Sequence, residues 1–128
     1  MQIHRLDHVN IRTNQLDVLI QWYTDVLGMK SGDRPDFAFP GAWMYLGDDA
    51  PVHLVGVNGD PGKGSESTLK LEHFALSGSG RQDFEERLNA RDIAFKRIEI
   101  PSFGVVQINL WDPDGNHIHV DFPLDEEQ

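Results

Sequence analysis

Two histidines and a carboxylate alternate near the end of the chain, and together they could bind a metal ion or move a proton. The stretch reads Asp-Pro-Asp-Gly-Asn-His-Ile-His-Val-Asp-Phe over residues 112–122. Asp-Pro-Asp-Gly is typical of a tight turn, and a strand is expected to follow it. In a strand, His117, His119 and Asp121 would share one face, and the apolar residues between them would line the other. The alternative is that this strand end is simply a solvated edge.

Other histidines recur at matching intervals, and this repeat is the strongest signal in the sequence. Leu-Asp-His-Val-Asn-Ile at 6–11 lines up with Leu-Glu-His-Phe-Ala-Leu at 71–76, 65 positions later, and Val-His-Leu at 52–54 lines up with Ile-His-Val at 118–120, 66 positions later. Four of the six histidines therefore hold equivalent places in a duplicated unit, namely His8, His53, His73 and His119. Such a set favours metal ligation over four unrelated core or surface groups. His4 and His117 have no repeat partner, and we interpret them as surface groups or as groups that support the ligands.

The elements that would position these residues follow the same order in both halves. In the first half, the pattern predicts a strand over 3–13, a helix over 15–27, one or two short strands within 30–40, and a hairpin of strands 42–46 and 52–57. In the second half it predicts a strand over 69–76, a helix over 82–91, strands over 93–98 and 105–111, and a last strand within 112–122. Asn14 is the expected N-cap of the first helix and Gly28 its C′ residue. A Gly-, Ser- and Pro-rich linker is expected between the halves.

Composition limits the class of protein and of partner. A chain of 128 residues fits one compact domain with a real core, and its 11 basic and 21 acidic residues give a formal charge of -10. This charge argues against nucleic acid and against an anionic membrane surface as partners. Because the sequence has no cysteine, the strong metal ligands available are His, Asp and Glu. No signal region or membrane-length apolar run is evident, so the expected location is the cytoplasm.

Four motifs give the chain a family resemblance. They are Leu-Asp-His-Val at 6–9, Trp-Tyr-Thr-Asp-Val-Leu-Gly-Met at 22–29, the segment 71–76, and Asp-Pro-Asp-Gly-Asn at 112–116. With these motifs the chain resembles the vicinal oxygen chelate superfamily, which includes glyoxalase I, extradiol dioxygenases and bleomycin-resistance proteins. The resemblance implies a single α+β domain over 1–128, in which two βαβββ modules (1–57 and 69–123, joined by a linker at 58–68) form a paired, cup-shaped mixed sheet. It also implies a homodimer.

The resemblance further implies one divalent metal ion, with zinc, nickel, manganese or iron as candidates. Carried over by position, His8, His53, His73 and His119 are its ligands. Position 119 departs from the family pattern, which usually has Glu there, and a neutral His leaves the site one negative charge poorer. Asp121, two residues further along the same face, could supply the missing carboxylate. His119 and Asp121 are therefore the candidate catalytic residues.

Several polar and aromatic residues are candidates for substrate binding, namely Arg34, Trp43, Tyr45, Gln107 and Asn109. Arg34 lies in a loop with two aromatic residues and could form a lid that clamps a carboxylate, or it could be a surface ion-pair partner. Gln107 and Asn109 alternate so that both face either the substrate or the solvent.

Three functions remain open at this point. The first is a metal-dependent isomerase, epimerase or lyase that chelates two neighbouring oxygens of a small, oxygen-rich metabolite. The second is a histidine-ligated iron dioxygenase. The third, from a different class, is a metal-free ligand-binding protein of the bleomycin-resistance type, in which the repeated histidines would have no physical purpose.

Overall fold

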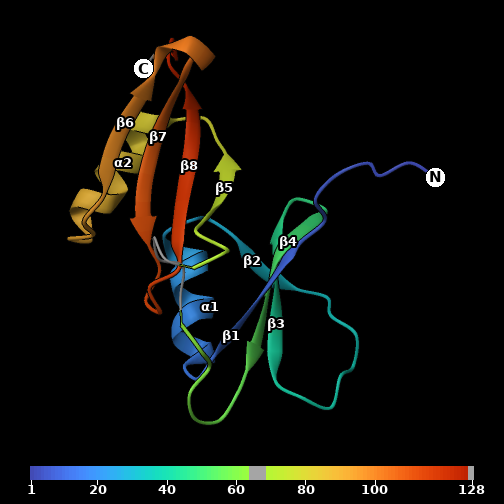
Figure 1. Ribbon diagram of the computed structural model, residues 1–128. Coiled ribbons are helices and arrows are strands. Elements are labelled where there is room, and N and C mark those ends of the chain that lie inside the picture. The colour runs from blue at the N-terminus through green and yellow to red at the C-terminus, as the bar shows by residue number, and fades with distance from the viewer. Residues whose placement is uncertain (64–68, 127–128) are drawn as a thin grey trace. The chain divides into compact units, whose positions relative to one another are not determined.

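The first half of the chain folds into one four-stranded sheet with one helix. The computed structural model describes residues 1–63 and 69–126 and divides into two compact units, Met1–Gly62 and Lys63–Gln128. In the first unit the elements are β1 (Val9–Thr13), α1 (Leu16–Asp25), β2 (Lys30–Gly32), β3 (Gly41–Leu46) and β4 (Asp49–Gly56). The sheet has the order β1-β4-β3-β2, with β1 parallel to β4 and the other pairs antiparallel (Figure 1).

The second half repeats this arrangement. Its elements are β5 (Phe74–Ser77), α2 (Arg81–Ala90), β6 (Lys96–Ile100), the short 3-10 helix η1 (Pro101–Phe103), β7 (Val105–Trp111) and β8 (His117–Pro123). The sheet order is β5-β8-β7-β6, with β5 parallel to β8 (Figure 1). The predicted α+β fold class is confirmed, as is the order of strand, helix and three strands in each half.

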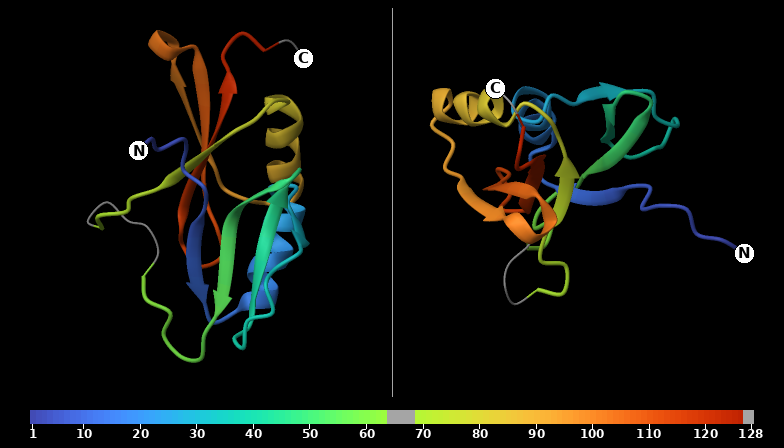
Figure 2. Two further views of the ribbon diagram at one scale, coloured as in Figure 1. Left: turned by 90° about the vertical axis from the view of Figure 1, so that its right-hand side faces the viewer. Right: turned by 90° about the horizontal axis from the view of Figure 1, so that it is seen from above.

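Each helix buries its apolar side against one face of its own sheet. Helix α1 lies against β2, β3 and β4 (Figure 2). It buries Leu19 and Tyr23 completely. In the second unit Phe84 of α2 packs against Phe122 of β8, with ring centroids 5.7 Å apart. The strand residues on this face are buried, and they include Met44, Val52, Leu54, Ile108, Leu110, Ile118 and Val120. Because side chains alternate along a strand, the polar and aromatic residues between them lie on the opposite face of each sheet.

Three predicted strands begin later than the sequence pattern indicates, and one of them is β6, which starts at Lys96 rather than residue 93. The first strand starts at Val9 rather than residue 3, because Val9 pairs with Val52 and the next position back on β4 is Pro51, which has no N–H to donate. The strand predicted over 69–76 starts at Phe74, since its partner β8 itself begins only at His117. The histidines at positions 8 and 73 therefore lie just before their strands.

The ends of the first helix and the linker also differ from the prediction. Asn14 does not cap α1; its side-chain amide donates instead to the Gly59 carbonyl at 2.9 Å, and residue 15 occupies the N-cap position without a side-chain cap. Gly28 has the positive φ of 73° expected of a residue that follows a helix. Part of the predicted linker, residues 64–68, lies outside the described residues.

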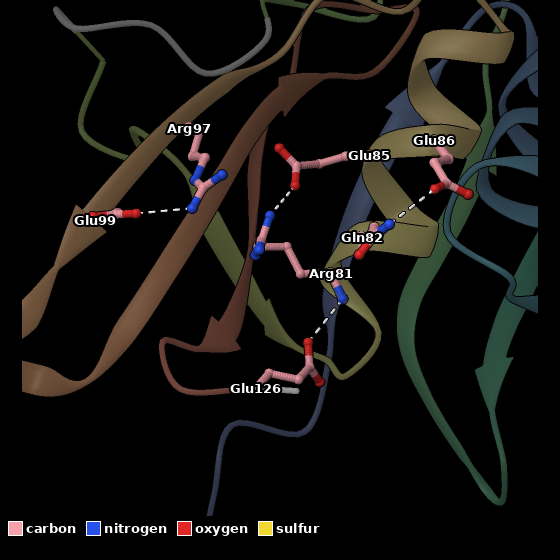
Figure 3. A network of polar contacts seen from close by, with 7 residues as sticks. All are labelled: Arg81, Gln82, Glu85, Glu86, Arg97, Glu99 and Glu126. Atoms are coloured by element: carbon pink, nitrogen blue, oxygen red, sulfur yellow. Dashed lines mark hydrogen bonds and ion pairs between the residues drawn. The ribbon is translucent and has the colours of Figure 1, made fainter. Parts of the chain in front are cut away.

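Helix α2 has a glycine, Gly80, at its N-cap position, and its first N–H groups are capped by a residue near the end of the chain. The Glu126 carboxylate accepts a hydrogen bond from the backbone N–H of Gly80 at 2.7 Å. It accepts another from the backbone N–H of Arg81 at 2.9 Å (Figure 3). This satisfies two N–H groups that have no partner within a helix and places negative charge at its positive end. Arg81 also pairs with Glu85, one turn later in the helix (Figure 3). In the part of the chain that is described, no helix is long and apolar enough to cross a membrane.

Candidate functional site

In the first unit, two of the predicted ligands and one predicted substrate-binding residue stack on one another. Strand pairing aligns His53 of β4 with Asn10 of β1 on one side and with Trp43 of β3 on the other. The His53 ring stacks on the Trp43 ring at 4.0 Å and on the His8 ring at 3.8 Å, with interplanar angles of 13° and 11°. Since two rings cannot stack on the same face of the His53 imidazole, His8 and Trp43 cover its opposite faces and hold it between them. The structure therefore brings these three predicted residues together.

These rings lie beside a cavity of about 450 Å³ that is formed by the first unit alone. Its lining combines aromatic rings, one cation and three carboxylates, contributed by Phe37, Phe39, Trp43, Tyr45, Arg34, Asp7, Asp48 and Asp49 together with His8 and His53. The Arg34 guanidinium lies 5.0 Å from the centroid of Phe37 and 5.1 Å from that of Phe39, and it donates to the Phe39 carbonyl. This loop therefore forms one wall of the cavity, with its cation positioned by two rings.

In the second unit, the histidine face is formed by β8 and the strands beside it. His119 pairs with Ala75 of β5 and Asn109 of β7, so Asn109 and His119 lie side by side. The ring of His73 lies 4.6 Å from that of His119 and 5.2 Å from that of His117. His119 is buried, and its Nδ1 lies 2.6 Å from the Asp121 carboxylate. The predicted pairs His8 with His53 and His73 with His119 are thus each brought together within their own unit.

A carboxylate completes a second cluster around His73. Glu72 places one carboxylate oxygen 2.8 Å from His117 Nδ1 and the other 3.2 Å from His73 Nδ1. The possible ligand atoms of Glu72, His73 and His117 all lie within 4.8 Å of one another. Two imidazoles and one carboxylate at this spacing suit a first-row divalent metal ion. On its chemistry and spacing, the donor set therefore fits the metal that the sequence predicts.

The carboxylates beside the histidines are ionised at neutral pH. A hydrogen bond with His117 and, next, the neighbouring His73 ring lower the pKa of Glu72 below its ordinary value. In the first unit the hydrogen bond from His8, at 2.8 Å, lowers the pKa of Asp7 in the same way. Each unit thus places an ionised acid directly before its first repeated histidine, His8 or His73, and in contact with it, as the repeat of Asp-His and Glu-His suggests.

We expect His53 to make the folded state less stable as the pH falls. Burial, and next the neighbouring His8, lower the pKa of His53 below its ordinary value of 6.5. Below that value the unfolded chain binds a proton that the folded chain does not bind, so the free energy of unfolding decreases with falling pH. Urea unfolding at about pH 7.5 and about pH 5.5 should show a larger loss for the wild type than for His53→Gln. An equal loss in both proteins would contradict this assignment.

Sequence reasoning missed the role of Glu72 and set His117 aside. The two repeated histidines of the second half, His73 and His119, are 46 positions apart. The parallel pairing of β5 with β8, however, joins residues 44 apart, such as Phe74 with Ile118. Extending that register by one residue places position 73 opposite His117. The acid that directly precedes both His8 and His73 was a signal present in the sequence for Asp7 and Glu72.

Comparison with known proteins agrees with this architecture. The family model described as Glyoxalase/Bleomycin resistance protein/Dioxygenase superfamily matches residues 5–120. Two similar solved structures are a glyoxylase/bleomycin resistance protein/dioxygenase domain from Frankia sp. EAN1pec (TM-score 0.77, 22% identity, covering 95% of this chain and 99% of that one) and a lactoylglutathione lyase from Agrobacterium tumefaciens (TM-score 0.71, 17% identity, 95% and 96%). These likenesses concern the fold. The chain belongs to the Glyoxalase/Bleomycin resistance protein/Dioxygenase superfamily.

One relative is similar at the level of sequence. Biphenyl-2,3-diol 1,2-dioxygenase 3 of Rhodococcus globerulus is 31% identical over 122 residues, which cover 91% of this chain. The chain spans 62% of the length of that relative.

Proposed function

We propose that the protein is a divalent-metal-dependent enzyme that acts on a small molecule with two neighbouring oxygens. One observation carries this proposal: the repeated histidines lie together in each unit, His8 with His53 and His73 with His119. Each pair lies beside the face of its sheet that the helix of that unit does not cover. We propose His8, His53, His73 and His119 as ligands, and zinc, nickel, manganese or iron as the ion. When bound, such an ion would polarise the substrate oxygens and stabilise negative charge that develops on them.

His119 and Asp121 form the proposed acid-base pair. A carboxylate 2.6 Å from Nδ1 favours the tautomer that carries its proton on Nδ1, which leaves Nε2 with its lone pair exposed for a ligand or a proton. In this proposal Asp121 orients the His119 ring and fixes its tautomer, and it does not itself contact the substrate.

The cavity of the first unit is the proposed binding pocket for the substrate. Trp43 and Tyr45 offer flat aromatic walls and Arg34 offers a fixed positive charge, so a planar substrate with anionic oxygens would be held by stacking and by charge. Gln107 remains a proposed polar contact on the second sheet. The amide oxygen of Asn109, also proposed for substrate binding, is engaged by His117 at 2.8 Å.

Among the possible reactions, we favour oxygen-dependent cleavage of an aromatic vicinal diol. Two observations support it over isomerase or lyase chemistry: the aromatic lining of the cavity and the sequence similarity to a biphenyl-2,3-diol dioxygenase. Isomerisation or lyase chemistry on a non-aromatic substrate is the second candidate, because a structurally similar protein is a lactoylglutathione lyase. Metal-free ligand binding of the bleomycin-resistance type is the third.

The test is oxygen uptake by protein loaded anaerobically with Fe(II) and then mixed with biphenyl-2,3-diol or catechol. We expect one O2 consumed for each diol lost, and we expect Trp43→Leu to raise KM by about tenfold through the lost aromatic contact. His4→Ala is the matched control, because His4 is an exposed histidine outside the cavity, and it should leave both constants unchanged. Metal-loaded protein that binds neither diol nor oxygen would contradict the dioxygenase proposal and leave the isomerase or lyase as the better account.

We also propose that residues 1–57 and 69–123 are two modules of a single domain joined by the linker at 58–68. The protein is proposed to act as a homodimer in the cytoplasm, and light scattering on the purified chain tests its mass in solution.

A further inference from the structure

The second unit contains a set of three donor atoms that the repeat does not predict. The Glu72 carboxylate lies 2.8 Å from His117 Nδ1 and 3.2 Å from His73 Nδ1. For a metal-ligand distance of about 2.1 Å, neighbouring donor atoms lie about 3.0 Å apart in an octahedral site and about 3.4 Å apart in a tetrahedral one. The two separations end at different oxygens of the Glu72 carboxylate, so they match the edges of a coordination shell in which the carboxylate binds the ion through both oxygens.

The hydrogen bonds of His117 define which of its ring nitrogens carries a proton. Asn109 donates through its side-chain nitrogen to the Lys96 carbonyl at 3.4 Å, which directs its amide oxygen toward His117 Nε2 at 2.8 Å. His117 must then donate from Nε2, so in the neutral ring Nδ1 is a bare acceptor. That acceptor faces the Glu72 carboxylate, which is also an acceptor. A cation is needed between them, either a proton or a metal ion.

His73 favours the metal ion over the proton alone. Its Nδ1 is buried and makes no hydrogen bond within the described residues, although Glu72 lies 3.2 Å away. A buried ring nitrogen without a hydrogen bond costs free energy that a shared cation would recover. A proton held between Glu72 and His117 cannot reach His73 as well, whereas a single ion can bind all three groups.

The surroundings hold the donors in place before any ion binds. The Trp111 ring stacks on His117 with centroids 4.8 Å apart and an interplanar angle of 13°. Asn109 holds the other edge of the same ring. These contacts limit rotation of the imidazole, which is how neighbouring residues usually orient the ligands of a metal site.

We infer that Glu72, His73 and His117 bind a first-row divalent metal ion as a site with two histidines and one carboxylate, and that Asn109 is its positioning residue. Donor sets of this type serve Fe(II) in particular, and also accept Zn²⁺ and Co²⁺. In this inference Glu72 and His117 replace His8, His53 and His119 as ligands of the one ion, and His73 is kept. The inference rests on the proposed function only for the use of the ion in catalysis. Binding itself can be tested without turnover.

The experiment is a titration of the tag-free protein with Co²⁺, followed by its visible absorption and by competition with a chromophoric chelator. We expect one ion per chain, at least about 100-fold weaker binding in Glu72→Gln and His117→Asn, and about 10- to 100-fold weaker binding in Asn109→Leu. Glu86→Gln and His4→Asn are the controls, because they change an exposed acid and an exposed histidine outside the cluster, and they should bind as the wild type does. Circular dichroism checks that each variant folds.

A second measurement uses the unaltered protein. In nitrogen NMR spectra, the Nδ1 resonances of His73 and His117 should shift when Zn²⁺ is added. If instead only the rings of His8, His53 or His119 shift, and Glu72→Gln and His117→Asn bind normally, the inference is overturned while the proposed function stands. If Co²⁺ binds through Glu72 and His117 but no diol or other substrate is turned over, the inference stands and the proposed function fails. Absence of any metal binding overturns both.

Discussion

His73→Ala is expected to weaken divalent-metal binding by at least about 100-fold, the largest effect of any single substitution at the site. His73 is the one histidine shared by the repeated set and by the cluster with Glu72, so both proposed arrangements lose a ligand. Its ring lies 4.6 Å from that of His119 and 5.2 Å from that of His117. Loss of a supporting contact alone costs about 10- to 100-fold in metal affinity, and loss of a ligand should cost more.

Competition with a chromophoric chelator measures this affinity, and His4→Ala is the matched control. Stability should change little, because His73 precedes β5 and contributes little to the apolar core. Wild-type affinity in His73→Ala would exclude both ligand sets at once.

Ile118→Ala is expected to lower the free energy of unfolding by about 2–5 kcal/mol. Ile118 lies between two histidines in the sequence, but its side chain points to the other face of the sheet and is 0% exposed. Removing most of this side chain loses the free energy of burying it and leaves a cavity among β5, β7 and β8, because Ile118 pairs with Phe74 and Leu110. Urea unfolding followed by circular dichroism gives the value.

Ile98→Ala provides a matched control, because it removes the same atoms from an isoleucine of the same sheet that is 39% exposed. Its cost should stay below about 1 kcal/mol. Equal losses for Ile98→Ala and Ile118→Ala would show that the faces of the second sheet are assigned incorrectly.

The fold could be predicted largely because the same order of strand and helix patterns occurs in both halves of the sequence. Residues 105–111 alternate cleanly, and β7 has the predicted bounds, Val105–Trp111. Helix α1 follows from the spacing of residues such as Leu19 and Tyr23, both of which are fully buried. Each half carries the same succession of patterns, so an error in one element is corrected by its counterpart.

Strand ends could not be predicted, because they depend on the partner strand. Residues 3–8 alternate well enough for a strand. The position on β4 that residue 8 would pair with is Pro51, however, which has no N–H to donate. Similarly, β8 begins only after the Asp112 carboxylate has accepted hydrogen bonds from the backbone N–H groups of Asp114 and Asn116, each at 2.9 Å. These are contacts between residues, and alternation in a single segment does not reveal them.

The site illustrates the same limit. The repeat identifies which histidines are equivalent, and the structure brings each pair together. The repeat does not reveal which residues lie opposite one another, because that depends on the register of β5 and β8. Since Glu72 precedes the strand, alternation does not assign it to a face, and its contact with His117 becomes evident only from the fold.

Elemental analysis of purified, tag-free protein tests most directly whether this chain binds one divalent metal ion through its histidines. We predict close to one ion per chain in the wild type, and none in the variant with His8, His53, His73 and His119 all changed to Ala. Wild-type protein that holds no metal after incubation with Fe(II), Zn²⁺, Ni²⁺ and Mn²⁺ would contradict the claim and leave metal-free ligand binding as the function that the fold supports.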